Sequence, residues 1–353
     1  MTNNNTSSYY NLIMGDSDQS YKHQFHAKWF EFLDELYEPY GYALQLRIGN
    51  HLRPLLVYWG GALGAQSARK MAIEDITELA ICVEILHKTS IIVDDLIDED
   101  VKRHNKSAFH IQFSSDETII FAVYMLGIAF KKINVLSQKY THLQTPFTSM
   151  YAQTLFEMAT GCLSELKLTQ EKRYNYQNVV SIICKETSTL IKNSLLIGFL
   201  TNSLADKNAV TVIEQIGEKV GYLFQTMNDL EPFCDDKNLT QHKGTLNLDF
   251  NRARKNIVLP YIFGCCSVSE KQKLLDSEEI DTSLILKLYE KYQIKSVIKD
   301  DINDIQHQLE MHFGELEQMQ INLACLTDFK HFYHDIMKIA SNRLTGNSSM
   351  PID

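Results

Sequence analysis

Proline and glycine are scarce in this chain. Only 6 prolines and 15 glycines are spread over 353 residues, and so few turn formers favour long helices over many short strands. Apolar residues make up 44% of the sequence, which is enough for a sizeable core. We therefore expect one all-α domain at residues 21–344, with a disordered tail at 1–20 and a loose tail at 345–353.

The chain also has fewer basic than acidic residues. The formal net charge of -10 makes a nucleic-acid partner unfavourable. The seven cysteines have no metal-ligand spacing, so reduced thiols in a cytoplasmic protein are expected. The N-terminus has no signal-peptide pattern. The longest apolar run, 119–130, is shorter than the roughly 20 residues that span a bilayer, so no transmembrane segment is expected.

Apolar residues recur at helical spacing along most of the chain, and they predict a series of long helices. One helix leads from about residue 71 into the stretch 87–103 discussed below. Further helices are predicted near 23–37, 54–62, 116–135, 143–166, 175–201, 208–230, 283–292, 300–319 and 326–344.

The most informative stretch is 87–103, which reads HKTSIIVDDLIDEDVKR. Asp94 and Asp98 are four residues apart and share one helical face, with Asp95 beside them. Three carboxylates at the end of an apolar helix repel one another unless a cation lies between them. Their oxygens suit Mg²⁺, which usually binds protein carboxylates and substrate phosphate together. The alternative is an acidic helix end that faces solvent.

A second acidic stretch, Asn228-Asp229-Leu230-Glu231, ends another apolar helix more than 100 residues later. Taken alone it is a weak signal, because Asn-Asp at a helix end is often a cap or a turn. Basic residues follow both acidic stretches: Arg103 after the first, and Lys243, Arg254 and Lys255 after the second. Two carboxylate clusters with cations at the rim can hold a metal–diphosphate complex.

From about residue 49 to 260, the chain resembles the trans-prenyl diphosphate synthases, or polyprenyl synthases. The motif Asp94-Asp95-Leu96-Ile97-Asp98 carries the resemblance together with five further matches: His87 seven residues before it, Leu52-Arg53-Pro54, Arg103, the Phe224-Gln225 pair, and Leu259-Pro260. The resemblance implies an isoprenoid synthase helical bundle with a deep central apolar cavity. It also implies bound Mg²⁺, an allylic prenyl diphosphate substrate and a homodimer.

The same resemblance assigns roles to individual residues. It implies that the catalytic residues are Asp94, Asp95, Asp98, Arg103 and Asp229, and that Asn228 joins the four aspartates as a metal ligand. The substrate-binding residues are then Arg53, His87, Arg103, Lys185, Gln225, Lys243, Arg254 and Lys255. Ser90 and Thr89, four and five residues before the acidic motif, occupy the floor that limits chain length. Both are small, so substrates of the C15–C20 class are favoured.

The chain departs from the family pattern where the acceptor, isopentenyl diphosphate, is bound. Asn50 replaces a lysine, and His104 replaces an arginine. Only Arg53 then remains as a fixed cation, since histidine titrates near pH ~6.5. Each lost charge-assisted bond to phosphate is worth roughly 1.5–3 kcal/mol. This departure suggests an enzyme that ionises a prenyl diphosphate but elongates it poorly.

The second acidic motif and the family's Lys-Thr pair also depart. Asn228-Asp229 begins like the second metal motif of terpene cyclases, but Pro232 and Asp236 break that pattern. Glu186 is inserted between Lys185 and Thr187. The sequence thus predicts either a terpene synthase or a prenyltransferase that uses an acceptor other than isopentenyl diphosphate. Conventional chain elongation and a non-catalytic subunit of the same fold remain as alternatives.

Overall fold

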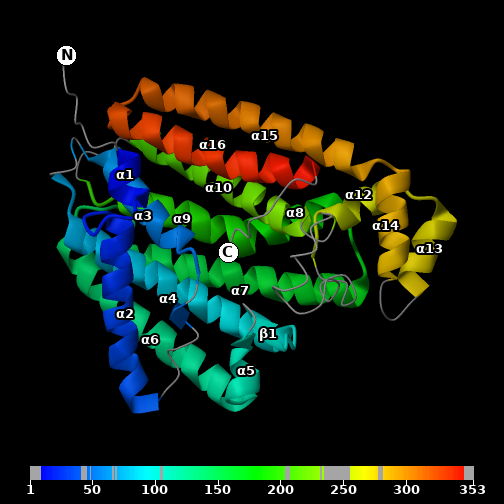
Figure 1. Ribbon diagram of the computed structural model, residues 1–353, viewed down its shortest axis with the longest axis horizontal. Coiled ribbons are helices and arrows are strands. Elements are labelled where there is room, and N and C mark those ends of the chain that lie inside the picture. Colours follow the sequence, from blue (N-terminus) through cyan, green and yellow to red (C-terminus); the bar gives the residue numbers. More distant parts are fainter. Residues whose placement is uncertain are drawn as a thin grey trace.

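Helices form almost all of the described chain (Figure 1). The computed structural model describes residues 9–40, 46–47, 49–65, 67, 70–103, 106–202, 207–230, 233, 255–276 and 281–345. The first half contains α1 (Tyr9–Met14), α2 (Tyr21–Tyr40), α3 (Leu52–Gly64), α4 (Ile73–Ile97), β1 (Lys102–Arg103), β2 (Lys106–Ser107), α5 (Phe109–Gln112), α6 (Ser115–Lys139) and α7 (Phe147–Glu171). The second half contains α8 (Tyr176–Ile183), η3 (Cys184–Ser188), α9 (Thr189–Phe199), α10 (Lys207–Leu230), α12 (Val258–Cys265), α13 (Val268–Asp276), α14 (Thr282–Lys291), α15 (Ile294–Glu317) and α16 (Leu323–Thr345).

The predicted all-α bundle is confirmed. A continuous apolar core extends from Ile13 to Met337 and draws on nearly every helix. In Figure 1, α4, α7, α9, α10 and α16 run roughly along the long axis of the molecule, while α2 crosses them at one end. The short strands β1 and β2 pair as an antiparallel hairpin directly after α4. This hairpin determines where Arg103 lies relative to the acidic end of α4.

The N-terminal tail predicted at 1–20 is shorter in the structure. Tyr9–Met14 form α1, and Ile13 is fully buried. The backbone N–H of Tyr10 donates to Asp328 on α16, and the Tyr10 hydroxyl donates to Asp335 on the same helix. A few apolar residues can therefore be ordered by a partner helix more than 300 residues away, which a local composition argument does not detect. Residues 1–8 and the tail at 346–353 lie outside the described residues.

The single helix predicted at 175–201 is interrupted by one π-helical turn, η3. A π turn accommodates one extra residue in a helix, and such turns occur often at functional sites. It coincides with Lys185-Glu186-Thr187, where the sequence carries its inserted residue. The insertion is thus absorbed locally, and α8 and α9 each keep their buried faces.

Helices α3 and α9 approach each other closely at glycines. A Cβ atom at Gly60 would overlap the carbonyl oxygen of Leu195, and one at Gly198 would overlap the carbonyl oxygen of Val57. The two helices can pack this tightly only because neither glycine has a side chain. This contact fixes α3, and with it the loop that begins at Gly49, against the rest of the bundle.

Helix α6 has an apolar surface that is partly exposed. Ile119, Ile120 and Val123 are each more than half exposed. Among the described helices, α6 alone is long and apolar enough to cross a bilayer by length and composition, with a third of its apolar window buried. The absence of a transmembrane segment therefore stays a prediction.

Candidate active site

The first acidic motif lies at the C-terminal end of α4. Asp94 is exposed and Asp98, the C-cap residue, is half-buried, whereas Asp95 is only 2% exposed. Arg103 on β1 donates its Nε to Asp95 at 3.0 Å, and its Nη2 makes a second, shorter contact with the same carboxylate. The motif is therefore divided: Asp95 is buried and bound by Arg103, whereas Asp94 is exposed and Asp98, one turn further along, is half-buried.

The second acidic motif ends α10, and Asp229 within it is buried. One carboxylate oxygen of Asp229 accepts a hydrogen bond from Gln225 Nε2 at 2.7 Å, and the other accepts from the backbone N–H of Ile257 at 2.7 Å. Asn228 is half-buried beside it. Asp229 thus fixes the segment that begins at Lys255 to the end of α10.

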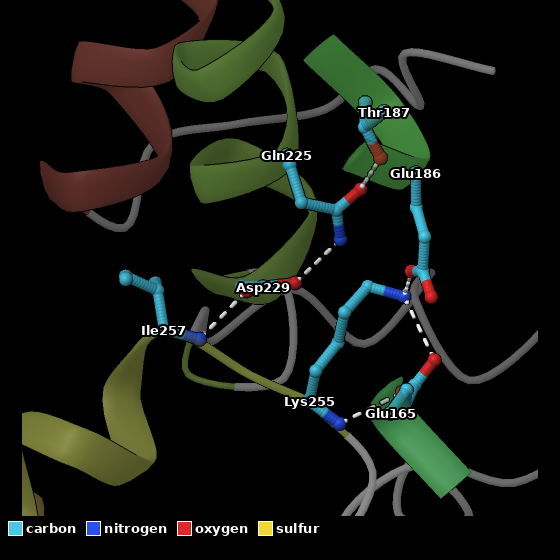
Figure 2. A network of polar contacts seen from close by, with 7 residues as sticks. All are labelled: Glu165, Glu186, Thr187, Gln225, Asp229, Lys255 and Ile257. Atoms are coloured by element: carbon cyan, nitrogen blue, oxygen red, sulfur yellow. Dashed lines mark hydrogen bonds and ion pairs between the residues drawn. The ribbon is translucent and has the colours of Figure 1, made fainter. Parts of the chain in front are cut away.

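A chain of hydrogen bonds links this aspartate to the π turn (Figure 2). Thr187 Oγ1 donates to Gln225 Oε1 at 2.8 Å, and the amide of Gln225 then donates to Asp229. The predicted substrate residue Gln225 therefore connects η3 with α10. Its role in binding substrate stays a prediction.

Lys255 is bound by two carboxylates. Its backbone N–H and its Nζ both donate to Glu165 on α7, at 2.8 and 3.1 Å, and its Nζ also forms an ion pair with Glu186 (Figure 2). Burial raises the pKa of Glu186 to about 8, with contributions from Glu165 and Asp94, although Lys255 opposes the shift. Against the effect of burial, Glu186 and Glu165 raise the pKa of Lys255 well above its usual range.

The charge of Asp94, in the first acidic motif, acts on residues that lie near the second acidic motif. Asp94 contributes to the raised pKa of both Glu186 and Lys255. It also contributes, after burial and Glu186, to the pKa of about 11 at Cys162 on α7. Because Lys255 is two residues from Ile257, which binds Asp229, both motifs border one region between α4, α7, η3 and α10.

The predicted acceptor residues meet at the start of α3. Arg53 Nη1 lies 2.9 Å from His87 Nε2, and its guanidinium lies over the ring of Phe224, 5.5 Å from the centroid. Arginine can only donate, so the Nε2 atom of His87 accepts and its ring is neutral. Burial and the charge of Arg53 lower the pKa of His87 well below its usual range. Arg53 thus connects the first acidic helix with α10.

The predicted chain-length residues Thr89 and Ser90 differ in their surroundings. Ser90 Oγ donates to the carbonyl oxygen of His87 in its own helix at 2.8 Å. Thr89 is buried, and its hydroxyl has no hydrogen-bond partner among the described residues. A small, mainly apolar cavity lies deeper in the bundle, between α4, α7 and α9. It is lined by Val83, Leu86, Met150, Tyr151, Thr154, Leu190, Asn193, Ser194 and Ile197.

Two of the predicted substrate cations, Lys243 and Arg254, lie outside the described residues, as do His104, Pro232 and Asp236. Lys185 is described and half-buried on η3. Against the effect of burial, a hydrogen bond from Thr189, with Lys185 among the nearby cations, lowers the pKa of Glu157 on α7. Whether Lys185 contacts a diphosphate stays a prediction.

The arrangement fits a magnesium ion that is shared with a substrate. In the described ranges, no three His, Cys, Asp or Glu side chains come together as a metal site. Magnesium, however, is commonly held by one or two carboxylates and by substrate phosphates. Asp94 and Asp98 carry carboxylate oxygens one helical turn apart, and such hard oxygen ligands suit magnesium.

Sequence reasoning missed Glu165 and Glu186 as the partners of Lys255. It also assigned no role to Lys88. Glu186 carried a usable signal, because it is the inserted residue in a motif that is otherwise recognisable. Glu165 carried none, since it is one of several charged residues on a long helix and its partner is 90 residues away.

A sequence profile of the polyprenyl synthetase family matches residues 33–292. The chain belongs to the polyprenyl synthetase family. The matched range contains both acidic motifs, Lys255 and the helices that carry them. The resemblance to polyprenyl synthases expected from the sequence is therefore confirmed.

Two relatives of this polyprenyl synthetase chain illustrate its distance from known members. It is 22% identical over 238 residues to the heptaprenyl diphosphate synthase component 2 of Bacillus subtilis, covering 67% of this chain and 64% of the relative. It is 23% identical over 233 residues to the short chain isoprenyl diphosphate synthase of Methanocaldococcus jannaschii, covering 65% of this chain and 66% of the relative. The match thus spans just under two thirds of the length of each relative.

The fold is shared with solved structures of the same family. A polyprenyl synthase from Caulobacter crescentus, complexed with calcium and isoprenyl diphosphate, superposes with a TM-score of 0.68 at 15% sequence identity. The superposition covers 93% of this chain and 96% of that structure. At this identity the likeness establishes the polyprenyl synthetase fold alone.

Proposed function

We propose that this chain is a magnesium-dependent prenyl diphosphate synthase. It ionises an allylic prenyl diphosphate with release of the diphosphate group, and it joins the carbocation to the double bond of isopentenyl diphosphate. The new cation then loses one proton, which the released diphosphate can accept. The observation that carries the proposal is the shared region between the two acidic motifs: Asp94 acts on Glu186 and Lys255, and Asp229 anchors the segment that carries Lys255. A calcium ion and an isoprenyl diphosphate in the Caulobacter relative support the same ligand class.

Asp94 and Asp98 would hold the magnesium ion. When bound, the ion supplies Lewis-acid stabilisation of the diphosphate leaving group. Arg103 orients Asp95 and places a guanidinium beside the motif, where it can neutralise negative charge that develops as the carbon–oxygen bond breaks. The apolar lining behind α4 excludes water from the cation.

Lys255 has a conditional role in this scheme. Its ammonium group is bound by Glu165 and Glu186. A diphosphate in the region influenced by Asp94 would compete with these carboxylates for the same donor. Burial raises the pKa of Glu186 to about 8, so Glu186 takes up a proton as the pH falls through about 8, and this weakens its hold on Lys255.

The size of the substrate follows from α4. The cavity lined by Val83 and Leu86 lies 8 to 11 residues before Asp94, or about 12–17 Å along the helix at 1.5 Å per residue. Thr89 and Ser90, between this cavity and Asp94, have small side chains. They favour allylic substrates of the C15–C20 class.

A second candidate fate of the cation rests on position 50. Asn50 carries no charge, and Asn228 replaces a carboxylate at the start of the second motif. Both changes favour a reaction that ends in cyclisation, proton loss or transfer to another acceptor. This terpene-synthase-like reading is discriminated from elongation by the products themselves.

The deciding experiment is an incubation with geranyl, farnesyl or geranylgeranyl diphosphate and Mg²⁺, with and without isopentenyl diphosphate, followed by mass spectrometry. Elongated diphosphates that form only with isopentenyl diphosphate support the main proposal. Hydrocarbon or alcohol products without it support the second. No diphosphate release under either condition indicates a non-catalytic subunit and overturns both.

Asp94→Ala provides the matching variant. It is expected to lower diphosphate release by about 100-fold or more, since charge stabilisation at the leaving group is lost. Asp300→Ala is the control, because Asp300 is an exposed aspartate on α15. Equal rates for the two variants would contradict the role of the first motif.

Two further properties of the molecule are also proposals. We expect a homodimer, although the name of the Bacillus relative, a component 2, points to unlike partners in that system. A cytoplasmic location stays a prediction from the cysteine usage and the N-terminal sequence.

A further inference from the structure

A cluster of buried basic side chains lies where α3 begins, around one carboxylate. Lys88 Nζ is 3.5 Å from Glu84 Oε1, and His51 Nδ1 lies 3.0 Å from the same oxygen. The side chains of Lys88 and Glu84 are 7% and 1% exposed. A lysine is rarely buried to this extent unless its charge has a defined use or partner.

Lys88 extends from α4 to the loop that precedes α3. A Cβ atom at Gly49 would lie 2.8 Å from Lys88 Nζ, so the ammonium group sits directly against this loop. Gly49 has a φ of 142° and His51 one of 50°. This left-handed backbone lets the loop wrap closely around the ammonium. Lys88 therefore delivers its charge beside position 50, although it belongs to another helix.

The charges of this cluster favour an anion. Arg53 and Lys88 carry fixed positive charges, whereas His87 is neutral because it accepts from Arg53. Against the effect of burial, Lys88 and His51 lower the pKa of Glu84, which is therefore ionised. The first turn of α3 adds the positive end of a helix dipole at the same place.

We propose that Lys88, together with Arg53, binds the diphosphate group of the acceptor substrate. This inference rests on the proposed function and identifies Lys88 as a residue that determines acceptor specificity. The cation missing at position 50 is supplied from α4. On this proposal the subsite keeps two fixed cations, Arg53 and Lys88, whereas the replacements at Asn50 and His104 alone predict poor elongation.

The test compares Lys88→Met with Lys88→Arg in steady-state kinetics. With allylic substrate saturating, Lys88→Met is expected to raise the KM for isopentenyl diphosphate at least about 10-fold, as the loss of one charge-assisted phosphate contact predicts. The KM for the allylic substrate is expected to change less than about 2-fold. Lys88→Arg keeps the charge and is expected to recover most of the acceptor affinity.

Lys132→Met is the matched control. Lys132 also binds a glutamate of α4, Glu78, at 3.0 Å, but it lies on α6 away from the loop at Gly49. Its removal is expected to leave both KM values unchanged. An equal effect of Lys132→Met and Lys88→Met would mean that both act through the stability of α4, and it would overturn the proposal.

A second variant covers the case in which Lys88→Met fails to fold because Glu84 loses a partner. Glu84→Gln with Lys88→Met removes both charges, and its folding is checked by thermal melting. An unchanged KM for isopentenyl diphosphate in this folded variant would overturn the role of Lys88. The double variant is expected to show the same selective rise as Lys88→Met.

The proposed function and this inference fail in different ways. If the unaltered chain ionises an allylic diphosphate but never consumes isopentenyl diphosphate, the proposed function as a chain-elongating enzyme is wrong. Calorimetry with inorganic diphosphate, without metal, then tests the anion site directly. Weaker binding by Lys88→Met than by Lys132→Met supports the site, and equal binding overturns it.

Discussion

At the scale of single residues, the ion pair of Asp95 and Arg103 offsets the free-energy cost of burying a carboxylate in the site. Asp95 is almost fully buried, and Arg103 is 19% exposed beside it. An isolated buried carboxylate would be expensive, and the forked guanidinium satisfies both of its oxygens. The same contact fixes the hairpin β1–β2 relative to α4.

Removing Arg103 is expected to destabilise the fold as well as the site. Arg103→Met leaves Asp95 buried and without its partner, so the free energy of unfolding should fall by about 3–5 kcal/mol. Adding Asp95→Asn to Arg103→Met should recover part of this loss, since Asp95 then carries no charge, while the buried Asp100, 4.0 Å from Arg103 Nη2, still loses this ion pair. Urea denaturation of the two single variants and the double variant measures the coupling.

The exposed pair of Lys139 and Asp75 serves as the control for that cycle. The side chain of Lys139 is 56% exposed, so solvent screens the contact. Lys139→Met is expected to cost far less than Arg103→Met. Similar losses for the two variants, or additive effects of Arg103→Met and Asp95→Asn, would show that the buried ion pair is not coupled.

Glu186 gives the site a dependence on pH. Its pKa is about 8 in the folded chain, against an ordinary value of 4.5. The folded state therefore binds its proton more tightly than the unfolded state does. The resulting stability is fully present below about pH 4.5 and is lost as the pH rises through about 8.

Glu186→Gln is expected to flatten this part of the stability profile. One proton contributes at most about 1.4 kcal/mol per pH unit to the slope. Urea unfolding at pH 5, 6, 7 and 8 measures the difference in slope between the variant and the unaltered chain. Glu218→Gln, at an exposed position on α10, should leave the slope as it is. Parallel profiles for Glu186→Gln would disprove the assignment.

The residues that sequence reasoning found and those it missed differ in the range of their contacts. Asp94 and Asp98 are close in sequence, so helical spacing alone predicts their shared face. The bond between Lys255 and Glu165 spans 90 residues, and periodicity contains no information about it. Lys88 was overlooked because a lysine within a helix normally points to solvent, and only the packing of α3 on α4 buries it.

At the scale of elements, the close contact of α3 and α9 holds the acceptor loop in place. Gly60 and Gly198 lie at this crossing, and each would meet a backbone carbonyl of the other helix if it carried a side chain. The distance between α3 and α9 cannot increase there without moving Arg53, which is at the start of α3.

Gly60→Ala is therefore expected to lower the free energy of unfolding by about 1–3 kcal/mol, or by more if α3 cannot shift. Gly127→Ala is the matched control in α6, where a Cβ atom would meet no described atom within 4 Å. The control should stabilise the chain by about 0.5–1 kcal/mol, since alanine favours helix. Thermal and urea unfolding decide between them, and stabilisation by both would contradict the close contact.

The helices themselves could largely be predicted, because apolar residues recur at helical spacing along long amphipathic segments. Helix α10, expected at 208–230, is observed at Lys207–Leu230. The break at η3 could not be predicted from period alone, since a π turn changes the phase by one residue and leaves both flanking apolar patterns intact. The order of α1 depended on α16, which local sequence does not reveal.

At the scale of the whole molecule, α6 and α7 present an apolar face that the monomer leaves uncovered. Ile120 and Val123 on α6 are 68% and 63% exposed, and Phe156 and Leu163 on α7 are 64% and 68% exposed. The two helices are consecutive and contact each other where α6 ends and α7 begins, as Phe130 with Tyr151 and Ser137 with Thr148 show. Large exposed apolar patches commonly mark an interface.

A second copy of the chain is the occupant we expect, with a mass in solution of twice 40.7 kDa. Replacing Ile120 by Lys and Val123 by Glu together should give a monomer, because charges buried without partners oppose association. Light scattering coupled to size exclusion measures the mass of each form. Val268→Glu, at an 86% exposed position on α13, should leave the dimer intact.

Other occupants of this face predict different results for the same variants. A membrane partner predicts a monomeric chain that sediments with lipid vesicles and loses this binding in the Ile120/Val123 variant, since α6 is long and apolar enough for such contact. An unlike subunit predicts a monomer that does not bind vesicles. A dimer that survives both substitutions would place the interface elsewhere and would leave the exposure of α6 and α7 to be explained by another partner.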